Sequence, residues 1–159
     1  MHTKQKGNIA FSSVVLALQK EGLNVFSEIG DYSRIDLIAE MNGKTKSIQV
    51  KYSGGDDNFV KLNLKKSGPN GYRYTYSEKD VDWFAIYSPA SEKIAWIKSD
   101  VACKNSRQFV VRINKAKNNQ QQNVKLIEDY DINGFLRDFT QCSEPSIIAE
   151  DKVQTTTAE

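Results

Sequence analysis

An Asn-Gly pair at residues 42–43 constrains the fold of this chain more than any other sequence feature. Apolar segments flank it on both sides, and Asn-Gly in that setting is the strongest short-range signal for a two-residue β-hairpin. Pairing outward from the turn sets residues near 36 opposite residues near 49. Asp36, Gln49 and Lys51 would then meet on an otherwise apolar hairpin, with the last two on one face of their strand. Such convergence of polar groups indicates a site of chemistry.

Hydrophobic periodicity predicts an α/β domain over residues 1–140. Helices are expected at 6–21, near 98–103 and at 131–139, the first with Phe11 in its apolar stripe and Gly22 just past its end. Strands are expected at 24–29, in the segment that carries Asp36 and in the segment that ends at Lys51. Further strands are expected at 59–66, 72–76, 83–88, 93–97 and 107–113. The nearly continuous apolar runs at 83–88 and 93–97 are typical of the buried centre of a sheet. Residues 114–123 are expected to form a loop, and residues 141–159 a disordered acidic tail.

The composition excludes several classes of protein. With 39% hydrophobic and 26% charged residues the chain is typical of a globular protein in water. No apolar run approaches the length of a membrane span, and no signal peptide opens the sequence, so we expect a cytoplasmic location and no membrane partner. Cys103 and Cys142 lack metal-ligand spacing and fit two reduced thiols.

Charge is strongly polarised along the chain. Residues 44–79 hold eight Lys or Arg against three Asp or Glu, and residues 98–125 hold seven against one. Residues 126–159 reverse the balance, with two against eight. Two basic blocks suggest a polyanionic partner. A pair of solvated lysine-rich faces would explain the same pattern.

One basic block coincides with a second predicted hairpin, formed by strands 59–66 and 72–76 around the turn S-G-P-N-G. Alternation places its basic and polar side chains on one face, and a two-stranded ribbon of this kind fits the major groove of double-stranded DNA. The candidate DNA-contacting residues are Lys61, Asn63, Lys65, Lys66, Arg73 and Thr75, with Arg34 from the first hairpin. An ordinary exposed hairpin would show the same alternation.

The first hairpin carries the residue types needed for metal-dependent cleavage of a phosphodiester. Asp36 supplies a hard oxygen ligand for Mg²⁺, and the main-chain carbonyl of Val50 could supply another. Lys51 would stabilise charge on the phosphate or orient the attacking water. Purely structural roles also fit, with Asp36 capping a turn and Lys51 extending its stem to solvent.

The order of these residues resembles the PD-(D/E)xK nuclease superfamily, in its resolvase-like branch. The matching positions are Lys6-Gly7, Val15, Asp36-Leu37-Ile38 and Ile48-Gln49-Val50-Lys51. Within that branch the chain is most similar to small homing endonucleases encoded by cyanobacterial group I introns. The resemblance implies a restriction endonuclease-like core, in which helices flank a mixed central sheet and basic β-hairpins are added for DNA binding.

The resemblance also implies roles. Asp36 corresponds to the metal-binding Asp, Gln49 stands in place of the second acidic residue, and Lys51 is in the place of the catalytic Lys. Nucleases of this type hydrolyse DNA with Mg²⁺ and leave a 5′-phosphate. Two departures stand out: Gln49 is neutral, and Phe11 occupies a position where the branch usually carries Glu. Glu28, Asp31 and Glu40 are nearby in sequence, but their expected positions favour them less as ligands.

The function expected from the sequence is a site-specific double-strand DNA endonuclease of the homing type. Each chain has one candidate site, so cutting two strands predicts a homodimer or a dimer of dimers. Two alternatives fit the same residues. One is a catalytically impaired DNA-binding protein on the same scaffold, and the other is a nuclease that resolves DNA junctions.

Overall fold

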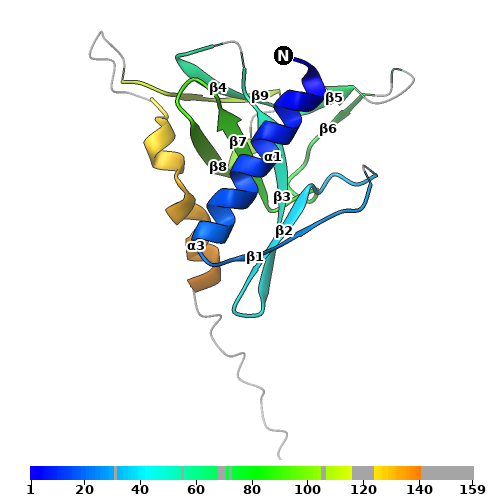
Figure 1. Ribbon diagram of the computed structural model, residues 1–159. Helices are drawn as coiled ribbons and strands as arrows, with labels where there is room; N and C mark the ends of the chain where they lie inside the picture. The colour runs from blue at the N-terminus through cyan, green and yellow to red at the C-terminus, as the bar shows by residue number, and fades with distance from the viewer. Residues whose placement is uncertain are drawn as a thin grey trace, which may run out of the picture.

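The computed structural model describes residues 1–30, 32–54, 56–67, 71, 73–104, 107–115 and 124–140 (Figure 1). The predicted tail at 141–159 and most of the predicted loop at 114–123 lie outside these residues. A five-stranded mixed sheet forms the centre, in the order β1 (Asn24–Ser27), β2 (Leu37–Met41), β3 (Lys44–Tyr52), β7 (Trp83–Ser88) and β8 (Lys93–Lys98). Neighbouring strands are antiparallel except β3 and β7, which run parallel. The predicted mixed sheet flanked by helices is confirmed.

The predicted Asn-Gly hairpin joins β2 to β3. Asn42 has a φ of 54° and Gly43 a φ of 76°, the two positive values that a type I′ turn requires. Leu37 pairs with Ile48, so the next residue outward on each strand brings Asp36 beside Gln49. Asp36 itself lies one residue before β2, where its main-chain N–H donates to the carbonyl of Ile48 at 2.9 Å.

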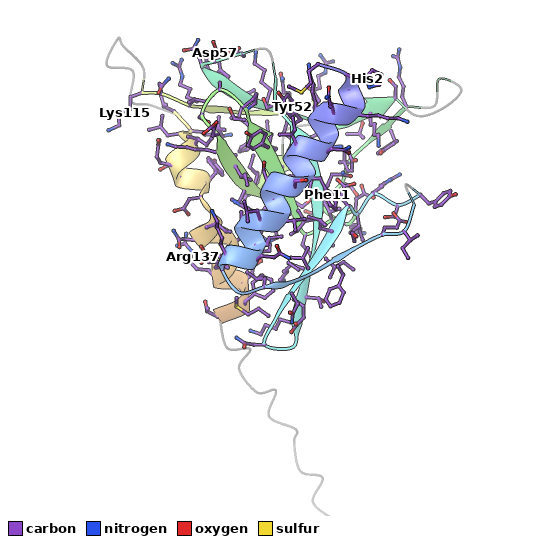
Figure 2. All side chains as sticks on the ribbon, viewed as in Figure 1. His2, Phe11, Tyr52, Asp57, Lys115 and Arg137 are labelled. Carbon is purple, nitrogen blue, oxygen red and sulfur yellow. The ribbon has the colours of Figure 1, made fainter. Side chains whose placement is uncertain are left out.

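Two helices cover one face of the sheet (Figure 1). Helix α1 (Thr3–Lys20) crosses β3 and buries Val14 and Leu18, and Figure 2 shows Phe11 midway along it. It begins three residues earlier than predicted, because Nδ1 of His2 accepts a hydrogen bond from the N–H of Lys4 and caps the first turn. Helix α3 (Ile132–Thr140) packs its aromatic side chains against β7 and β8 on the same face.

The opposite face is covered by a second layer. It consists of β4 (Phe59–Asn63), β9 (Gln108–Arg112), the short helix α2 (Ser99–Ala102) and a 3-10 helix at Ile127–Tyr130. Alternation along β7 divides the core between the layers: Trp83 and Ala85 face the helices, whereas Phe84 and Ile86 face β4 and β9. The sheet is thus buried on both faces at β7 and β8, which explains the nearly continuous apolar runs of these two strands.

The predicted pairing of strands 59–66 and 72–76 is wrong over most of its length. β4 pairs with β9, and only β5 (Lys65–Ser67) pairs with β6 (Arg73–Thr75). The partner changes at Leu64, whose N–H donates to the carbonyl of Arg107 while its carbonyl accepts from the N–H of Tyr76. Burial explains the change, because the apolar face of β4 continues the core only when Phe109 and Val111 of β9 lie beside it.

No helix in the described part of the chain is long and apolar enough to span a membrane.

Asp138 fastens α3 to the sheet. Its carboxylate accepts a hydrogen bond from Nε1 of Trp83 at 3.0 Å and lies 3.4 Å from Nζ of Lys98 and 3.8 Å from Nζ of Lys46. We expect Asp138→Ala to lower the free energy of unfolding by about 1–3 kcal/mol, because it leaves the part-buried indole N–H without an acceptor. Asp138→Asn keeps an acceptor and should lose less in urea denaturation. Equal losses for the two variants would contradict this account.

Candidate active site

The polar residues of the first hairpin meet as predicted. Gln49 Nε2 donates to Oδ2 of Asp36, and the N–H of Val50 donates to the same oxygen at 2.7 Å. Gln49 is buried, whereas Lys51 is partly exposed. Gln49 pairs in register with Phe84 and Lys51 with Ile86, so both side chains leave β3 on the face opposite α1. Asp36, Gln49 and Lys51 therefore form one cluster just before the start of β2 and along β3.

Tyr76, just after β6, completes this cluster. Its hydroxyl donates to Oε1 of Gln49 at 2.6 Å and accepts a hydrogen bond from Nζ of Lys51 at 3.3 Å. The Tyr76 ring packs edge-on against Phe84, with 5.4 Å between ring centroids. Burial, followed by the neighbouring hydroxyl of Tyr74, raises the pKa of Tyr76 far above its ordinary value. Tyr76 is therefore a neutral hydrogen-bonding group at neutral pH.

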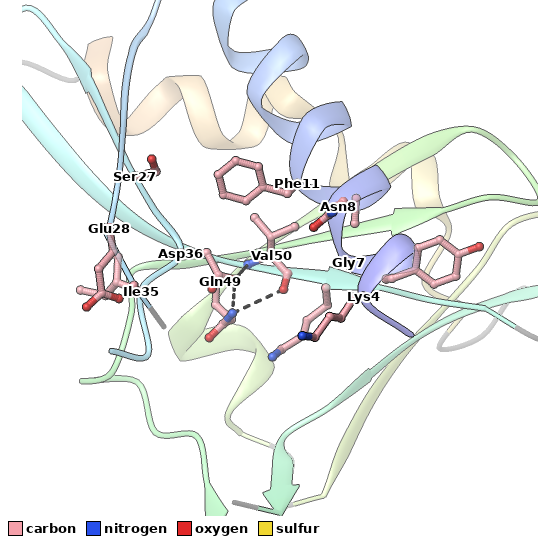
Figure 3. A pocket seen from close by; sticks show the side chains of 14 residues that line it. Lys4, Gly7, Asn8, Phe11, Ser27, Glu28, Ile35, Asp36, Gln49 and Val50 are labelled. Carbon is pink, nitrogen blue, oxygen red and sulfur yellow. Dashed lines mark hydrogen bonds between the residues drawn. The ribbon is translucent and has the colours of Figure 1, made fainter. Parts of the chain in front are cut away.

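A cavity of about 550 Å³ opens beside the cluster (Figure 3). One wall comes from α1, including Gly7 and Phe11, and the Phe11 ring points into the space next to Asp36 and Val50. Glu28 borders the cavity from the segment after β1, and its Oε2 accepts a hydrogen bond from the N–H of Ser33 at 3.1 Å. Glu40, by contrast, is bound to Asn24 and to the N–H of Gly43 in the turn. Asp31 lies outside the described residues.

The electrostatics of the cluster centre on Asp36. Burial raises the pKa of Asp36 above its ordinary value, while the hydrogen bond from Val50 and the charges of Lys51 and Lys66 oppose that rise. The influence of Lys66 shows that the β5–β6 hairpin brings positive charge close to the carboxylate. The Asp36 carboxylate is thus partly desolvated, and any positive charge added nearby would stabilise its ionised form.

Arg34, predicted to contact DNA, makes contacts within the protein. Its Nη1 forms an ion pair with Oδ1 of Asp80, and its guanidinium lies over the ring of Tyr74, with Cζ 4.5 Å from the centroid. Burial tends to raise the pKa of Asp80, but hydrogen bonds from Ser77 and Arg34 outweigh it and hold that pKa below its usual value. Arg34 therefore ties the segment before Asp36 to the segment before β7.

The structure divides the predicted DNA-contacting residues into two groups. Lys61 and Asn63 are exposed on β4, where Lys61 forms an ion pair with Asp56 at 2.7 Å. The remaining residues are exposed on the β5–β6 hairpin: Lys65, Lys66, Arg73 and Thr75. Register places Lys65 opposite Thr75 and Lys66 opposite Tyr74, so Lys66 points to the same side of the hairpin as Tyr74.

Comparison with known proteins agrees with this geometry. The family model described as PD-(D/E)XK endonuclease matches residues 1–133. The chain belongs to the PD-(D/E)XK endonuclease family. Its fold is similar to that of a bacterial homing endonuclease, I-Ssp6803I, with a TM-score of 0.70 over 86% of this chain and 93% of that chain, at 20% sequence identity. A search of curated proteins found no significant match.

PD-(D/E)XK nucleases generally use divalent metal ions, and the oxygen atoms here can be tested against that requirement. Within the described residues, no group of three or more His, Cys, Asp or Glu side chains is arranged to hold a metal. Mg²⁺, however, commonly binds through one or two carboxylates together with water and substrate phosphate. The hydrogen bonds from Gln49 and Val50 both end on Oδ2 of Asp36 and do not involve Oδ1. Val50 lines the cavity, and its carbonyl oxygen accepts a hydrogen bond from Gln49 Nε2 at 3.4 Å. This donor set of hard oxygens fits a site completed by substrate.

Sequence reasoning missed one residue of this endonuclease's candidate site, Tyr76. Tyr76 lies at the end of the run Y-R-Y-T-Y, and alternation with Arg73 and Thr75 already placed it on the inward face, but nothing local indicated Gln49 as its partner. Glu28, expected to be a less favourable ligand than Asp36, lines the cavity from the segment between β1 and Asp36.

Proposed function

We propose that this chain is a site-specific double-strand DNA endonuclease of the homing type, using Mg²⁺ and leaving a 5′-phosphate. The observation that carries the proposal is the convergence of Asp36, Gln49 and Lys51 beside a cavity, with a basic hairpin close enough to influence Asp36. Likeness in fold to a bacterial homing endonuclease supports the same conclusion.

Each residue has a chemical role in this proposal. Asp36 and the Val50 carbonyl would hold Mg²⁺, with Glu28 bordering the same space. When bound, that ion supplies a water of lowered pKa and stabilises charge on the phosphate. The ammonium of Lys51 stabilises the negative charge that develops on the phosphate oxygens. The Gln49 amide, tied to Asp36, holds the carboxylate in place.

One active site per chain acts on one strand. Cleavage of a duplex therefore calls for two chains, most simply related by a two-fold axis, as a homodimer or a dimer of dimers on a roughly palindromic target. Sedimentation of the protein with and without its target duplex checks this arrangement.

The deciding experiment selects bound duplexes from a random-sequence DNA pool and then tests the selected sites for cleavage. Mg²⁺ should give double-strand cuts at a defined position with 5′-phosphate ends, whereas Ca²⁺ should permit binding with little cleavage. A preference for four-way junctions over linear duplexes would instead assign a junction-resolving activity. Binding without cleavage in any divalent metal would remove the endonuclease assignment.

That last outcome corresponds to the second candidate function, a catalytically impaired DNA-binding protein. The Phe11 ring favours it, because an apolar side chain occupies the cavity wall next to Asp36 where the family branch usually carries Glu. The two functions share the DNA-binding surface and differ only in turnover.

The exposed basic residues of the β5–β6 hairpin give a direct test of DNA contact. We expect Lys65→Ala and Arg73→Ala each to weaken binding of all duplex sequences alike. Each should also reduce the slope of log affinity against log salt concentration by about one, because one fewer counterion is released. Lys93→Ala is the matched control, because Lys93 pairs with Glu128 away from the hairpin at 3.0 Å. Titrations at several salt concentrations measure the slope. An unchanged slope in both hairpin variants would place the DNA elsewhere.

A further inference from the structure

A directional series of hydrogen bonds connects Lys51 to Asp36. Lys51 Nζ donates to the Tyr76 hydroxyl, that hydroxyl donates to Oε1 of Gln49, and Gln49 Nε2 donates to Oδ2 of Asp36. Gln49 Nε2 also lies 3.4 Å from the carbonyl oxygen of Val50. The series thus joins the ammonium, the amide and the carboxylate of the candidate site through one phenol.

The chemistry of its two ends determines the direction. An ammonium has only donors and an ionised carboxylate has only acceptors. The Tyr76 oxygen therefore accepts from Lys51 and directs its single proton at Gln49. Gln49 must then turn its oxygen to Tyr76 and its NH₂ group to Asp36.

We propose that Tyr76 is a positioning residue, which holds the Gln49 amide as a donor to Asp36 rather than as an oxygen ligand. The inference rests on the proposed nuclease function and deepens it. Gln49 stands where related nucleases carry an acidic residue, and in this chain it serves the site by orienting Asp36. The same phenol positions Lys51, whose ammonium lies 5.1 Å from the centroid of the Tyr76 ring.

The surroundings of Tyr76 suit this role. The side chain is 3% exposed and its ring is held edge-on against Phe84. Its main-chain N–H donates to the carbonyl of Leu64 at 2.8 Å, at the point where the chain changes partner from β9 to β6. The phenol is therefore fixed by packing and by main-chain bonding before any substrate binds.

The first test observes the amide itself in metal-free protein. The side-chain NH₂ signals of Gln49, assigned by their loss in Gln49→Glu, are recorded by ¹⁵N NMR. We expect two well-separated protons with slow hydrogen exchange, and we expect Tyr76→Phe to shift them and to speed that exchange at least about tenfold. Tyr130→Phe is the matched control, because Tyr130 also packs edge-on against a phenylalanine, Phe109, in the layer of β4 and β9.

The second test uses cleavage rates. Tyr76→Phe should lower kcat about tenfold with little change in KM for DNA, whereas Tyr130→Phe should leave both unchanged. In a Gln49→Glu background the effect of Tyr76→Phe should shrink to about threefold or less, because a carboxylate presents oxygen in either rotamer and only the contact with Lys51 is lost. Thermal unfolding of each variant separates loss of stability from loss of orientation.

Two results would overturn the inference. Gln49 amide signals unchanged by Tyr76→Phe would show that the phenol does not orient the amide. An equal kcat loss from Tyr76→Phe in the parent protein and in the Gln49→Glu background would reduce Tyr76 to a packing residue. The NMR test stands even if the protein does not cut DNA, so failure of the inference and failure of the proposed function are distinguishable.

Discussion

Replacing Asp36 by Asn should abolish DNA cleavage while leaving the protein at least as stable at neutral pH. The loss of the carboxylate removes the principal anionic ligand of the proposed metal site. That effect corresponds to several kcal/mol of charge stabilisation, or about a thousandfold or more in rate. The fold should tolerate the change, since an Asn oxygen can still accept the bonds from Gln49 and Val50 that now end on Oδ2.

The stability difference should depend on pH in a defined direction. Burial raises the folded-state pKa of Asp36 above its ordinary value of 3.8, so the folded protein binds the proton more tightly than the unfolded chain does. The parent protein therefore loses stability as pH rises from the ordinary value through the folded-state pKa. Above that pKa the cost of the buried charge is fully present, and below about pH 3.8 it is absent.

Urea denaturation of both proteins across this pH range measures the difference. Asp36→Asn should gain stability relative to the parent at neutral pH, and the gain should vanish in acid. Glu40→Gln is a suitable comparison, because the partly exposed Glu40 carboxylate has a lowered pKa from its bonds with Asn24 and Gly43 and should show the opposite trend. Undiminished cleavage by Asp36→Asn would remove this carboxylate from the mechanism.

Replacing Phe11 by Glu should strengthen Mg²⁺ binding and raise the cleavage rate, each by about tenfold or more, because a second carboxylate would face the cavity beside Asp36. The half-buried Phe11 packs against the core under α1, so the variant should lose about 1–3 kcal/mol of stability without metal. Mg²⁺ should restore part of that loss, because a ligand that binds only the folded state stabilises it by mass action.

Phe11→Gln provides the matched control. It removes the same aromatic packing and has the same shape as Glu, but it adds no charge. It should lose similar stability, and Mg²⁺ should raise its unfolding temperature no more than that of the parent protein. If Phe11→Glu showed neither a Mg²⁺-dependent rise in unfolding temperature nor faster cleavage, Phe11 would be a core residue with no bearing on the site.

Some parts of this fold could be predicted from the sequence, because they depend on local patterns alone. The Asn-Gly turn sets its own register, so the approach of Asp36 to Gln49 followed from counting residues outward. The apolar stripe of α1 and the continuous apolar runs of β7 and β8 likewise require only periodicity and burial. Family motif and hairpin together were enough to place the candidate catalytic residues.

Pairing between strands that are far apart in the sequence could not be predicted from such local patterns. The predicted turn S-G-P-N-G could specify the pairing of only the nearest residues, whereas β4 pairs with β9 because Val60 and Leu62 need apolar neighbours that arrive much later in the chain. Arg34 shows the same limit. Its sequence position predicted a contact with substrate, and its ion pair with Asp80 depends on how two loops pack.

The sequence by itself determined the hairpin that carries Asp36, Gln49 and Lys51, because a two-residue turn and alternating side chains act over a few residues. Only the tertiary structure decided how those groups are oriented. Tyr76 reaches Gln49 from the segment just after β6, and Glu28 and Phe11 line the cavity from two further segments. Such contacts depend on the packing of whole layers, because each layer is placed by the total apolar surface it buries and not by the residues beside the site.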